Sequence, residues 1–392
     1  MAVNLKNAEK ALKTVYLDAV SEQLNLATNP LLAKIKQCTD DIYGNEVRKL
    51  AIYGVNGGVG AGSEDGELPM AGGNNYKQFV SKLKNLYGTI EISDKAVRVS
   101  ENNSSAFVNL LNAEMESLIR SSSFNFGRML FGNGSGALAD VMSVNGFELR
   151  LDSVRNVVEG MIVDIRDTYT GDMYPDCAGR RITNVDRKNK TVTVNGSSDS
   201  LKELTDATLY VQNTFYNEVT GIDAIFNLED YDLYGIERSK NSWIEPYIET
   251  DVGEIDENIL QKAIDTIEEN SGSTVNFIVC SWGVRRALQK ALAKNQIRMS
   301  SLTLEGGFNA ISFNGIPVVA DRFCPEGTMY LLNTNDFTLN QLCDWEWLAD
   351  DDGKILKQIP GRPVYSATLV KYAELICSRP CGQGKLSGII EE

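Results

Sequence analysis

The sequence predicts an α+β fold, and three stretches of the chain lead to that prediction. Residues 104–131 carry apolar side chains at the spacing of one long amphipathic helix. Residues 56–75 precede this helix as a glycine-rich loop between two extended arms. Residues 141–215 follow it and alternate apolar with polar side chains, as short antiparallel strands do. Because helices and strands occupy separate stretches, the pattern favours α+β.

Residues 1–45 predict a helical arm. Apolar side chains recur at helical spacing from Leu5 to Leu24, and Asn29-Pro30 interrupts the pattern before a shorter apolar stretch at residues 31–35. Lysines occupy the opposite face of the first stretch. Such an arm could lie on a neighbouring surface or pack on its own domain, and the pattern does not separate the two.

Residues 46–101 predict an extended hairpin. Residues 46–55 form one expected strand, and residues 76–99 return as a second extended arm. The loop between them, residues 56–75, contains seven glycines. A loop of this length without structure of its own is uncommon inside a compact domain and usually has a function. We therefore expect it to project from the body of the protein.

The long helix is expected at residues 104–131. At 1.5 Å per residue, residues 104–131 would span roughly 42 Å. Capping side chains are available at its start, and these are Asn102, Asn103 and Ser104. Glycines in left-handed conformations are expected to end it, and these are Gly132, Gly134 and Gly136. The expected buried stripe consists of Phe107, Leu111, Met115, Leu118, Phe126 and Met129.

The alternating strands at residues 141–215 predict a small antiparallel barrel or sandwich, inserted between two parts of another domain. Turn-forming residues such as Gly171-Asp172 and Asn195-Gly196 separate the alternating stretches. Regularly spaced short strands of this kind are typical of a closed or two-layered β unit.

Residues 256–359 predict a mixed region of two helices and several strands. Asp256 is placed to cap a helix that ends at Ser271-Gly272, and residues 274–280 form a buried strand. A second helix is expected from Trp282 to Asn295. Strands follow it, with hairpin turns predicted at two sites, Asn314-Gly315 and Asp352-Gly353. The buried face of the first helix should be Ile259, Leu260, Ala263, Ile264 and Ile267.

Composition excludes several classes of protein. The chain of 392 residues has a formal net charge of -15, which argues against tight binding of nucleic acid by phosphate neutralisation. It contains no histidine, which removes Ser-His and Cys-His nucleophiles and imidazole metal sites. Its seven cysteines are scattered and predict reduced thiols in a cytoplasmic setting. No apolar run is long enough for a membrane span, so we expect no membrane association and no secretion.

Two glycine clusters, residues 58–62 and 132–136, could suggest a phosphate-binding loop. A dinucleotide fingerprint must leave a strand and open a helix, whereas the first cluster leads into Ser63-Glu64-Asp65-Gly66 and the second ends a helix. Residues 350–353 carry three aspartates, but the ligand spacing of a calcium-binding loop is missing. We therefore expect no cofactor, no metal and no catalytic residue.

Two further clusters have simple structural interpretations. Asp344 and Glu346 alternate with two tryptophans and could serve a carboxylate-based carbohydrate-active enzyme, but a half-buried strand explains the alternation more simply. The most basic cluster, residues 180–190, is interrupted by Asp186 and is interpreted as a solvated turn with an ion-pairing role at an interface.

The order of these elements, together with several local motifs, resembles the major capsid proteins of tailed bacteriophages, the Hong Kong ninety-seven type fold. The resemblance spans nearly the whole chain and is strongest to phages of low-GC Gram-positive bacteria. The matching motifs are Asn29-Pro30-Leu31-Leu32, residues 53–58 with Leu68-Pro69, Ala106-Phe107-Val108 with Glu114-Met115-Glu116, residues 127–134, Gly221-Ile222, residues 234–239 and residues 281–286.

The resemblance implies a division of the chain into the parts of that fold. The implied parts are an N-terminal arm at 1–45, an extended loop at 46–101, the spine helix of the peripheral domain at 102–140, the inserted β domain at 141–215, peripheral-domain strands at 216–249, an axial domain at 250–360 and C-terminal strands with a tail at 361–392. The loop would reach over a neighbouring subunit. Its contact residues would be Gly57, Gly58, Gly60, Gly62, Gly66, Leu68, Pro69, Gly72 and Gly73.

The implied function is structural and not enzymatic. Members of this family form hexamers and pentamers of an icosahedral virion shell around double-stranded DNA, assembled in the host cytoplasm. Weak contact with DNA is consistent with the acidic composition, since a closed wall confines DNA without tight phosphate contacts. Portal proteins and head-decoration or completion proteins are implied as partners.

Two departures from family patterns carry expectations of their own. Some members have a long charged scaffolding segment before the arm, whereas this sequence starts close to the arm, so we expect a separate scaffold protein. Some members form covalent cross-links between Lys and Asn of neighbouring subunits. No motif in this sequence supports assigning such a cross-link to this chain, so we expect none. Two alternative functions stay open, an encapsulin-like protein compartment and the carbohydrate-active enzyme.

Overall fold

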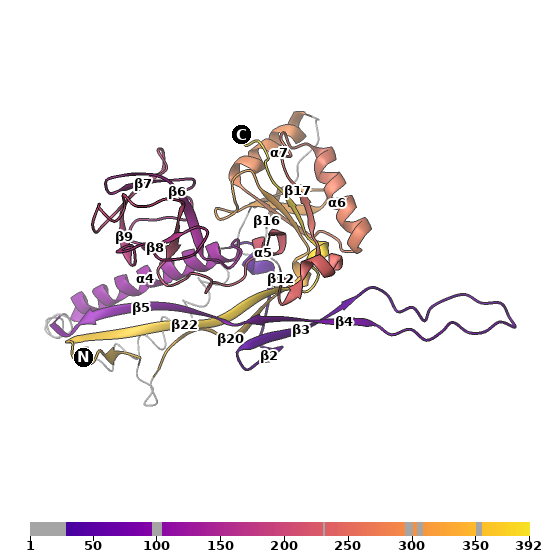
Figure 1. The fold of residues 1–392 in the computed structure, drawn as a ribbon, viewed down its shortest axis with the longest axis horizontal. Helices are drawn as coiled ribbons and strands as arrows, with labels where there is room; N and C mark the ends of the chain where they lie inside the picture. The colour runs from indigo at the N-terminus through magenta and orange to yellow at the C-terminus, as the bar shows by residue number, and fades with distance from the viewer. Residues whose placement is uncertain (1–28, 96–103, 230–231, 295–300, 304–308, 350–354) are drawn as a thin grey trace.

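The computed structural model describes residues 29–95, 104–229, 232–294, 301–303, 309–349 and 355–392. Figure 1 shows an elongated molecule with a long hairpin at one end and two compact units above a central sheet. The first stretch of the expected helical arm, Leu5 to Leu24, lies outside the described residues, as do the capping residues Asn102 and Asn103.

The central sheet is organised around β22 (Val364–Cys377), the long strand near the C-terminus. On one side β22 pairs antiparallel with β5 (Lys84–Ser93), from Val364 opposite Ser93 to Ala373 opposite Lys84. On the other side it pairs with β20 (Phe337–Trp347), and β21 (Lys357–Gln358) pairs with its first residues. The long shared ladder makes this sheet the support for the helix and the hairpin.

The predicted hairpin around Asp352-Gly353 is wrong in its pairing. The two strands that it would join, β20 and β21, both pair with β22 and not with each other. The turn residues themselves lie outside the described residues. The physical reason is length, since the 14-residue β22 offers β20 a far longer ladder than the two-residue β21 can.

The helical arm expected at residues 1–45 is wrong for its described part, residues 29–45, which contains only a single helical turn. The side-chain oxygen of Asn29 accepts hydrogen bonds from the amides of Leu31 and Leu32 and starts the short 3₁₀ helix η2 (Leu32–Lys34). The chain then extends as two short strands, β1 (Lys36–Cys38) and β2 (Ile42–Tyr43). Strand β1 pairs in parallel with β20. Burial of Leu31 and Leu32 in the main core favours this compact path over a continuing helix.

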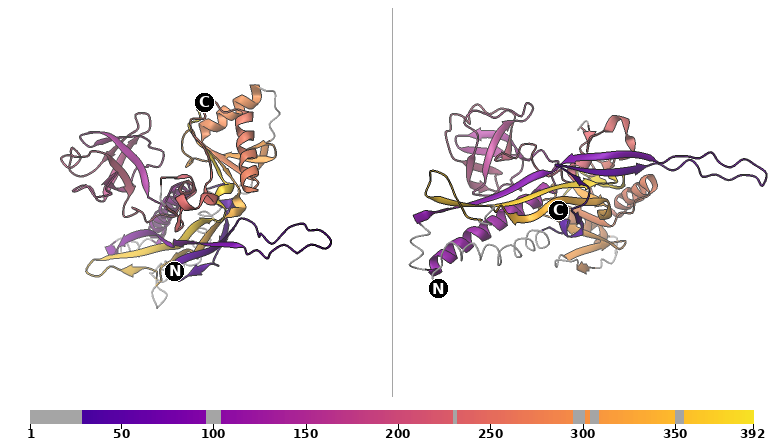
Figure 2. Two further views of the ribbon diagram at one scale, coloured as in Figure 1. Left: turned by 45° about the vertical axis from the view of Figure 1, so that its right-hand side comes forward. Right: turned by 90° about the horizontal axis from the view of Figure 1, so that it is seen from below.

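The long helix α4 (Ser104–Met129) lies along the central sheet, as the views in Figure 2 show. Of the expected stripe, Met115, Phe126 and Met129 are buried and Leu118 is partly buried. Side chains of residues 104–113, which include the predicted Phe107 and Leu111, are not among those described. Ile119 is a buried contact that the stripe missed. The helix therefore buries one face on the sheet, as predicted.

The strands after α4 form a closed barrel, which settles the alternative between barrel and sandwich. Its order is β10-β7-β6-β11-β8-β9, and its apolar interior includes Leu149, Val163, Ile182, Val192 and Leu209. The strands are β6 (Ala137–Asn145), β7 (Glu148–Leu151), β8 (Ile162–Asp167), β9 (Arg180–Asp186), β10 (Thr191–Val194) and β11 (Ala207–Val211). In Figure 1 the barrel sits above α4.

One member of the predicted solvated basic turn is not solvated. Arg180 is buried, and its guanidinium donates to the carbonyls of Asp176, Asn195 and Ser197 and to the Ser200 hydroxyl. The fixed fork of donors in arginine suits such a role, because it can satisfy several carbonyls of irregular loops at once. Arg180, the first residue of β9, therefore ties the loop before β9 to the loop after β10.

The second compact unit is a sheet covered by two helices. The sheet consists of β14 (Tyr247–Glu249), β23 (Gly384–Leu386), β19 (Met329–Leu332), β15 (Phe277–Cys280), β18 (Ile316–Ala320), β17 (Asn309–Phe313) and β16 (Ser301–Thr303), in this order. Helices α6 (Glu257–Ser271) and α7 (Trp282–Lys294) pack on it.

The local signals predicted for this unit are confirmed. The Asp256 carboxylate accepts from the amide of Ile259, and Gly272 ends α6 in the left-handed conformation with φ 62°. Asn314 and Gly315 both have positive φ, of 48° and 88°, as a two-residue hairpin between β17 and β18 requires. Of the expected buried face of α6, Ile259 is only partly buried.

A short linking region joins α4, the barrel and the second unit. It contains α5 (Asp223–Phe226), β12 (Asp232–Leu233), β13 (Ile236–Glu237) and the 3₁₀ helices η3 (Arg238–Lys240) and η4 (Ser242–Ile244). The 3₁₀ helix η7 (Pro380–Gly382) contacts η4, and hydrogen bonds from Ser378 and Gln383 join the residues beside η7 to Asp336 of η6 (Thr334–Asp336). Gly134 and Gly136 after α4 have positive φ, as predicted, but Gly132 does not. Gly221 lies against the carbonyls of Met129, Leu130 and Gly132, where a Cβ has no room.

Arg128, near the end of α4, forms a bidentate ion pair with Glu218, which follows the barrel. The two nitrogen–oxygen distances are 2.9 and 2.5 Å, and both side chains are almost fully buried. A buried charge that loses its partner is strongly destabilising, because the remaining ion is neither solvated nor neutralised. The pair therefore ties the helix end to the exit of the barrel.

We predict that Arg128→Ala lowers the free energy of unfolding by about 3–5 kcal/mol, since it leaves Glu218 buried without its partner. Urea denaturation followed by circular dichroism would measure this loss. Arg120→Ala is the control, because Arg120 pairs with Glu116 on the exposed side of the same helix, 82% exposed, and should cause little change. Equal effects of the two substitutions would contradict the importance of the buried pair.

Candidate intersubunit interface

The hairpin of β3 (Glu46–Tyr53) and β4 (Asn75–Lys82) carries the residues that the sequence placed in an intersubunit contact. Its strands pair in full register, from Glu46 opposite Lys82 to Tyr53 opposite Asn75. The loop between them, residues 54–74, extends away from the body in every view of Figures 1 and 2. The loop therefore projects from the body of the protein, as the sequence predicted.

The two faces of the hairpin differ sharply. Val47, Ala51 and Phe79 lie on one face and are buried against the body. On the other face, Ile52 is opposite Tyr76, and these side chains are 63% and 52% exposed. Leu50 on the same face is 58% exposed. The hairpin therefore presents an apolar face to solvent, which the sequence analysis missed although the alternation of β3 could have shown it.

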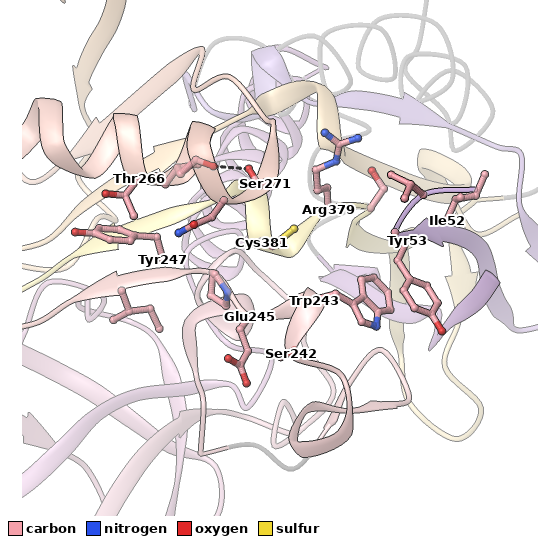
Figure 3. Close-up of a pocket in the computed structure, with 17 residues that line it drawn as sticks. Ile52, Tyr53, Ser242, Trp243, Glu245, Tyr247, Thr266, Ser271, Arg379 and Cys381 are labelled. Atoms are coloured by element: carbon pink, nitrogen blue, oxygen red, sulfur yellow. Dashed lines mark hydrogen bonds between the residues drawn. The ribbon is translucent and has the colours of Figure 1, made fainter. Parts of the chain in front are cut away.

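Aromatic contacts anchor the base of the hairpin. Tyr53 stacks on Trp243, with ring centroids 4.7 Å apart and planes 7° from parallel. The two side chains lie next to each other in Figure 3. Phe79 packs edge-on against Tyr234, and the amide of Val80 donates to the carbonyl of Tyr234. A cavity of about 800 Å³ lies beside this anchor, between the hairpin base, α6 and η7. The base is therefore held firmly while the loop beyond it is free of such contacts.

The predicted contact residues all lie along the projecting loop. Leu68 is 89% exposed, as is Met70, and Pro69 lies against Gly60. Gly66 closes a turn by donating its amide to the carbonyl of Ser63. The members of the predicted set along the loop are Gly57, Gly58, Gly60, Gly62, Gly66, Leu68, Pro69, Gly72 and Gly73.

Two of these glycines have a specific steric role. A Cβ on Gly72 would lie 2.6 Å from the amide nitrogens of Gly57 and Gly58, and one on Gly58 would lie 2.8 Å from that of Gly72. The two arms of the loop therefore approach too closely there for any side chain. Gly57 and Gly73 face open space instead. Close backbone approach, and not positive φ, explains Gly58 and Gly72.

A buried carboxylate lies where the hairpin meets the body. Glu374 of β22 is fully buried, and its Oε1 accepts from the Ser81 hydroxyl of β4 and the Thr220 amide. Its Oε2 is buried without a described hydrogen-bond partner. Burial raises the pKa of Glu374 to about 7, although the amide of Thr220 and the nearby charge of Lys84 act in the opposite direction. Protonation of this group therefore falls near neutral pH.

The residues proposed for carbohydrate chemistry are not arranged for it. Asp344 forms a 2.6 Å ion pair with the fully buried Lys371, while Trp345 and Trp347 are buried in the core. Buried tryptophans cannot stack on a sugar. Within the described part of the chain, no group of three or more His, Cys, Asp or Glu side chains is arranged to hold a metal ion. In the same part, none of the helices has both the length and the apolar character needed to span a bilayer.

The overall arrangement matches solved capsid structures. The capsid protein of cyanophage A-1(L) aligns with a TM-score of 0.56 over 94% of this chain and 93% of that chain, at 11% identity. The chain has the Hong Kong ninety-seven type capsid fold.

Other capsid-fold structures are similar at lower scores. An encapsulin from Synechococcus elongatus aligns with a TM-score of 0.45 over 95% of both chains at 10% identity. The mycobacterium phage Bobi protein aligns with a TM-score of 0.46 over 98% of this chain and 99% of that chain at 7% identity. No protein-family model and no curated protein matches the sequence.

We predict that Glu374 makes stability fall as pH rises. Its pKa is about 7 in the folded state against 4.5 in the absence of burial, so the folded state binds more protons between these values. The stabilising contribution is complete below pH 4.5 and is lost as pH rises through 7, at up to about 1.4 kcal/mol per pH unit. Glu374→Gln should flatten this dependence in urea denaturation from pH 5 to 8. Parallel profiles for both proteins would contradict the prediction.

Proposed function

We propose that this protein is the major capsid protein of a tailed bacteriophage. Copies assemble through hexamers and pentamers into the icosahedral virion shell that encloses double-stranded DNA. The observation that carries the proposal is the capsid fold itself, together with a long hairpin whose apolar face and loop have no cover within the described subunit. Exposed apolar surface of this kind is expected on a subunit that assembles with others and is uncommon on an isolated monomer.

The physical logic of a shell fits these surfaces. Burial of a large apolar side chain stabilises a contact by roughly 1.5–3 kcal/mol, so Leu50, Ile52 and Tyr76 would give a modest contribution per hairpin. Association also costs translational and rotational freedom, so one contact of this size is weak. Many such contacts in a closed shell act together, because each subunit is held by several neighbours at once.

The proposed parts of the subunit are those that the resemblance implies. They are the N-terminal arm at 1–45, the extended loop at 46–101, the spine-helix segment at 102–140, the inserted barrel at 141–215, peripheral strands at 216–249, the axial domain at 250–360 and C-terminal strands with a tail at 361–392. The loop residues 57–73 form the intersubunit contact. Assembly takes place in the bacterial host cytoplasm.

The proposed partners are other capsid components. A separate scaffold protein, a portal and head-decoration or completion proteins act with the shell, and packaged DNA is contacted weakly. The net charge of -15 supports weak DNA contact, because phosphate neutralisation requires clustered cations. The protein is not an enzyme, uses no cofactor and forms no covalent cross-links.

An encapsulin-like compartment is the alternative with the same fold. The two proposals differ in what the particle encloses, which is DNA in a phage capsid and an enzyme in a compartment. The inserted barrel favours the phage capsid. Electron microscopy of purified particles, followed by nuclease digestion and mass spectrometry of their contents, would decide. DNA-filled particles support the proposal, and particles that hold only an enzyme overturn it.

We predict that deletion of residues 57–73 leaves a folded subunit that assembles poorly, because the loop contributes to no described core cluster. Circular dichroism would check the fold, and negative-stain electron microscopy with sedimentation would measure shells. Normal shells from this variant would refute the role of the loop.

A finer comparison uses two neighbouring glycines. Gly72→Ala forces the arms of the loop apart and should lower shell yield, whereas Gly73→Ala faces open space and should assemble as wild type does. Both variants should denature like wild type, since neither position lies in a core. The same yield from both would show that the shape of the loop is unimportant.

A further inference from the structure

A neutral hollow lies beside the edge of the central sheet, and we propose that it binds an uncharged saccharide. The hollow has a volume of about 420 Å³ and lies between β5, the second half of α4 and the segment that leaves the barrel, residues 211–218. This volume falls within the range of about 300–1,000 Å³ that is usual for small-molecule sites. The inference goes beyond the proposed capsid function and does not depend on it.

The lining of the neutral hollow carries almost no charge. Charged residues make up 23% of the chain, so several would be expected in a lining of this size. Among the described lining residues, Glu218 alone has a charged side chain, and its buried carboxylate is held by both terminal nitrogens of Arg128. A charged ligand would lose its hydration here without gaining a partner of opposite charge. Phosphates, carboxylates and metal ions are therefore disfavoured.

Uncharged hydrogen-bonding groups form the exposed part of the lining. Asn85 of β5, Ser121 of α4 and Gln212 are exposed, and their side chains make no hydrogen bond in the described part of the chain. Amide and hydroxyl groups both donate and accept, so each can pair with a ligand hydroxyl in either direction. Among the described strands β5 pairs only with β22, so every second residue of β5 turns its backbone amide and carbonyl outward. An entirely apolar ligand would leave these groups unpaired.

The buried part of the lining is apolar, and an exposed tyrosine adjoins it. Leu86 of β5 and Phe126 of α4 are buried, and Leu118 is partly buried. Tyr87 also lines the hollow and is 61% exposed. Its ring meets the ring of Tyr372 edge-on, with centroids 6.4 Å apart. Tyr87 is therefore supported by a neighbour and still has ring surface for a ligand.

These properties together match an uncharged saccharide. Such a ligand has hydroxyl groups that donate and accept, and its ring has an apolar C–H face. The neutral groups of the exposed lining pair with the hydroxyls, while Tyr87 and the apolar lining contact the C–H face. A peptide strand fits less well, because its recognition needs separate pockets for alternate side chains and the hollow offers a single subsite.

The test is ligand binding to the folded, full-length subunit, measured by saturation-transfer NMR and isothermal titration calorimetry. The probes are glucose, galactose, mannose and N-acetylglucosamine, each as the free sugar and as its methyl glycoside. We expect at least one probe to bind with a Kd of about 1 mM, because a ligand of this size gains little beyond the cost of its lost freedom. Binding of a methyl glycoside assigns the site to the end of a glycan chain, whereas binding of the free sugar alone assigns it to a soluble sugar.

Charged forms of the same sugar test the neutrality of the site. The uronate and the phosphate ester of the sugar that binds should have a Kd at least about tenfold higher, because the described lining holds no lysine or arginine to pair with an anion. Equal affinity for the neutral and charged forms would overturn the inference.

Substitutions in the lining locate the site. Tyr87→Ala removes the ring contact and Gln212→Ala removes one donor and acceptor, and each should raise the Kd about fivefold. Tyr169→Ala is the matched control, because Tyr169 is a barrel tyrosine that is 83% exposed outside the lining, and it should bind as wild type does. Asn213 is left unchanged, since its backbone is left-handed with φ 62° and alanine would be strained there. Circular dichroism and thermal unfolding check that each variant is folded.

The outcomes distinguish this inference from the capsid function. If no probe binds at millimolar concentration, or if both lining variants bind as wild type does, the saccharide site is overturned while the capsid function stands. If the subunit forms no shells under any condition, the proposed function fails and the binding result is unaffected. A cryo-electron microscopy map of assembled particles gives an independent check, since a protein segment within the hollow would also overturn the inference.

Discussion

The pairing of β22 with β5 and β20 is the constraint on which the rest of the structure depends. One strand near the C-terminus holds β5 on one side and β20 on the other, and α4 lies along the sheet that results. Because β4 leads into β5 after the single residue Leu83, the ladder with β22 also sets the direction of the projecting hairpin. A strand near the C-terminus thus sets the direction in which a loop near the N-terminus projects.

Buried polar groups connect the helix, the barrel and the hairpin around this sheet. Arg128 and Glu218 pair at the end of α4, where the barrel departs and returns. Glu374 of β22 bonds both to the hairpin, through Ser81, and to the chain that leaves the barrel, through Thr220. Buried polar groups of this kind cost free energy unless they are satisfied, so they favour one arrangement of the parts over others. The contact between Glu374 and Ser81 holds the hairpin base on the body, while the loop beyond it stays uncovered.

Local signals in the sequence predicted local structure well. Asp256 and Gly272 bound α6 as expected, and Asn314-Gly315 forms its hairpin, because each signal acts through neighbouring backbone groups. The same reasoning failed for Asp352-Gly353, where a distant strand provides a longer ladder than the adjacent one. It also misjudged Arg180, since its carbonyl partners come from loops that meet only when the barrel closes.

For the candidate interface, the sequence by itself determined that a long glycine-rich loop lies between two strands and contains the predicted contact residues, because glycine content and strand alternation are local properties. Only the tertiary structure decided that Gly58 and Gly72 meet across the loop and that Ile52 and Tyr76 share an uncovered face. These facts depend on contacts between residues far apart in the chain, and such contacts exist only once the sheet, helix and barrel have packed together.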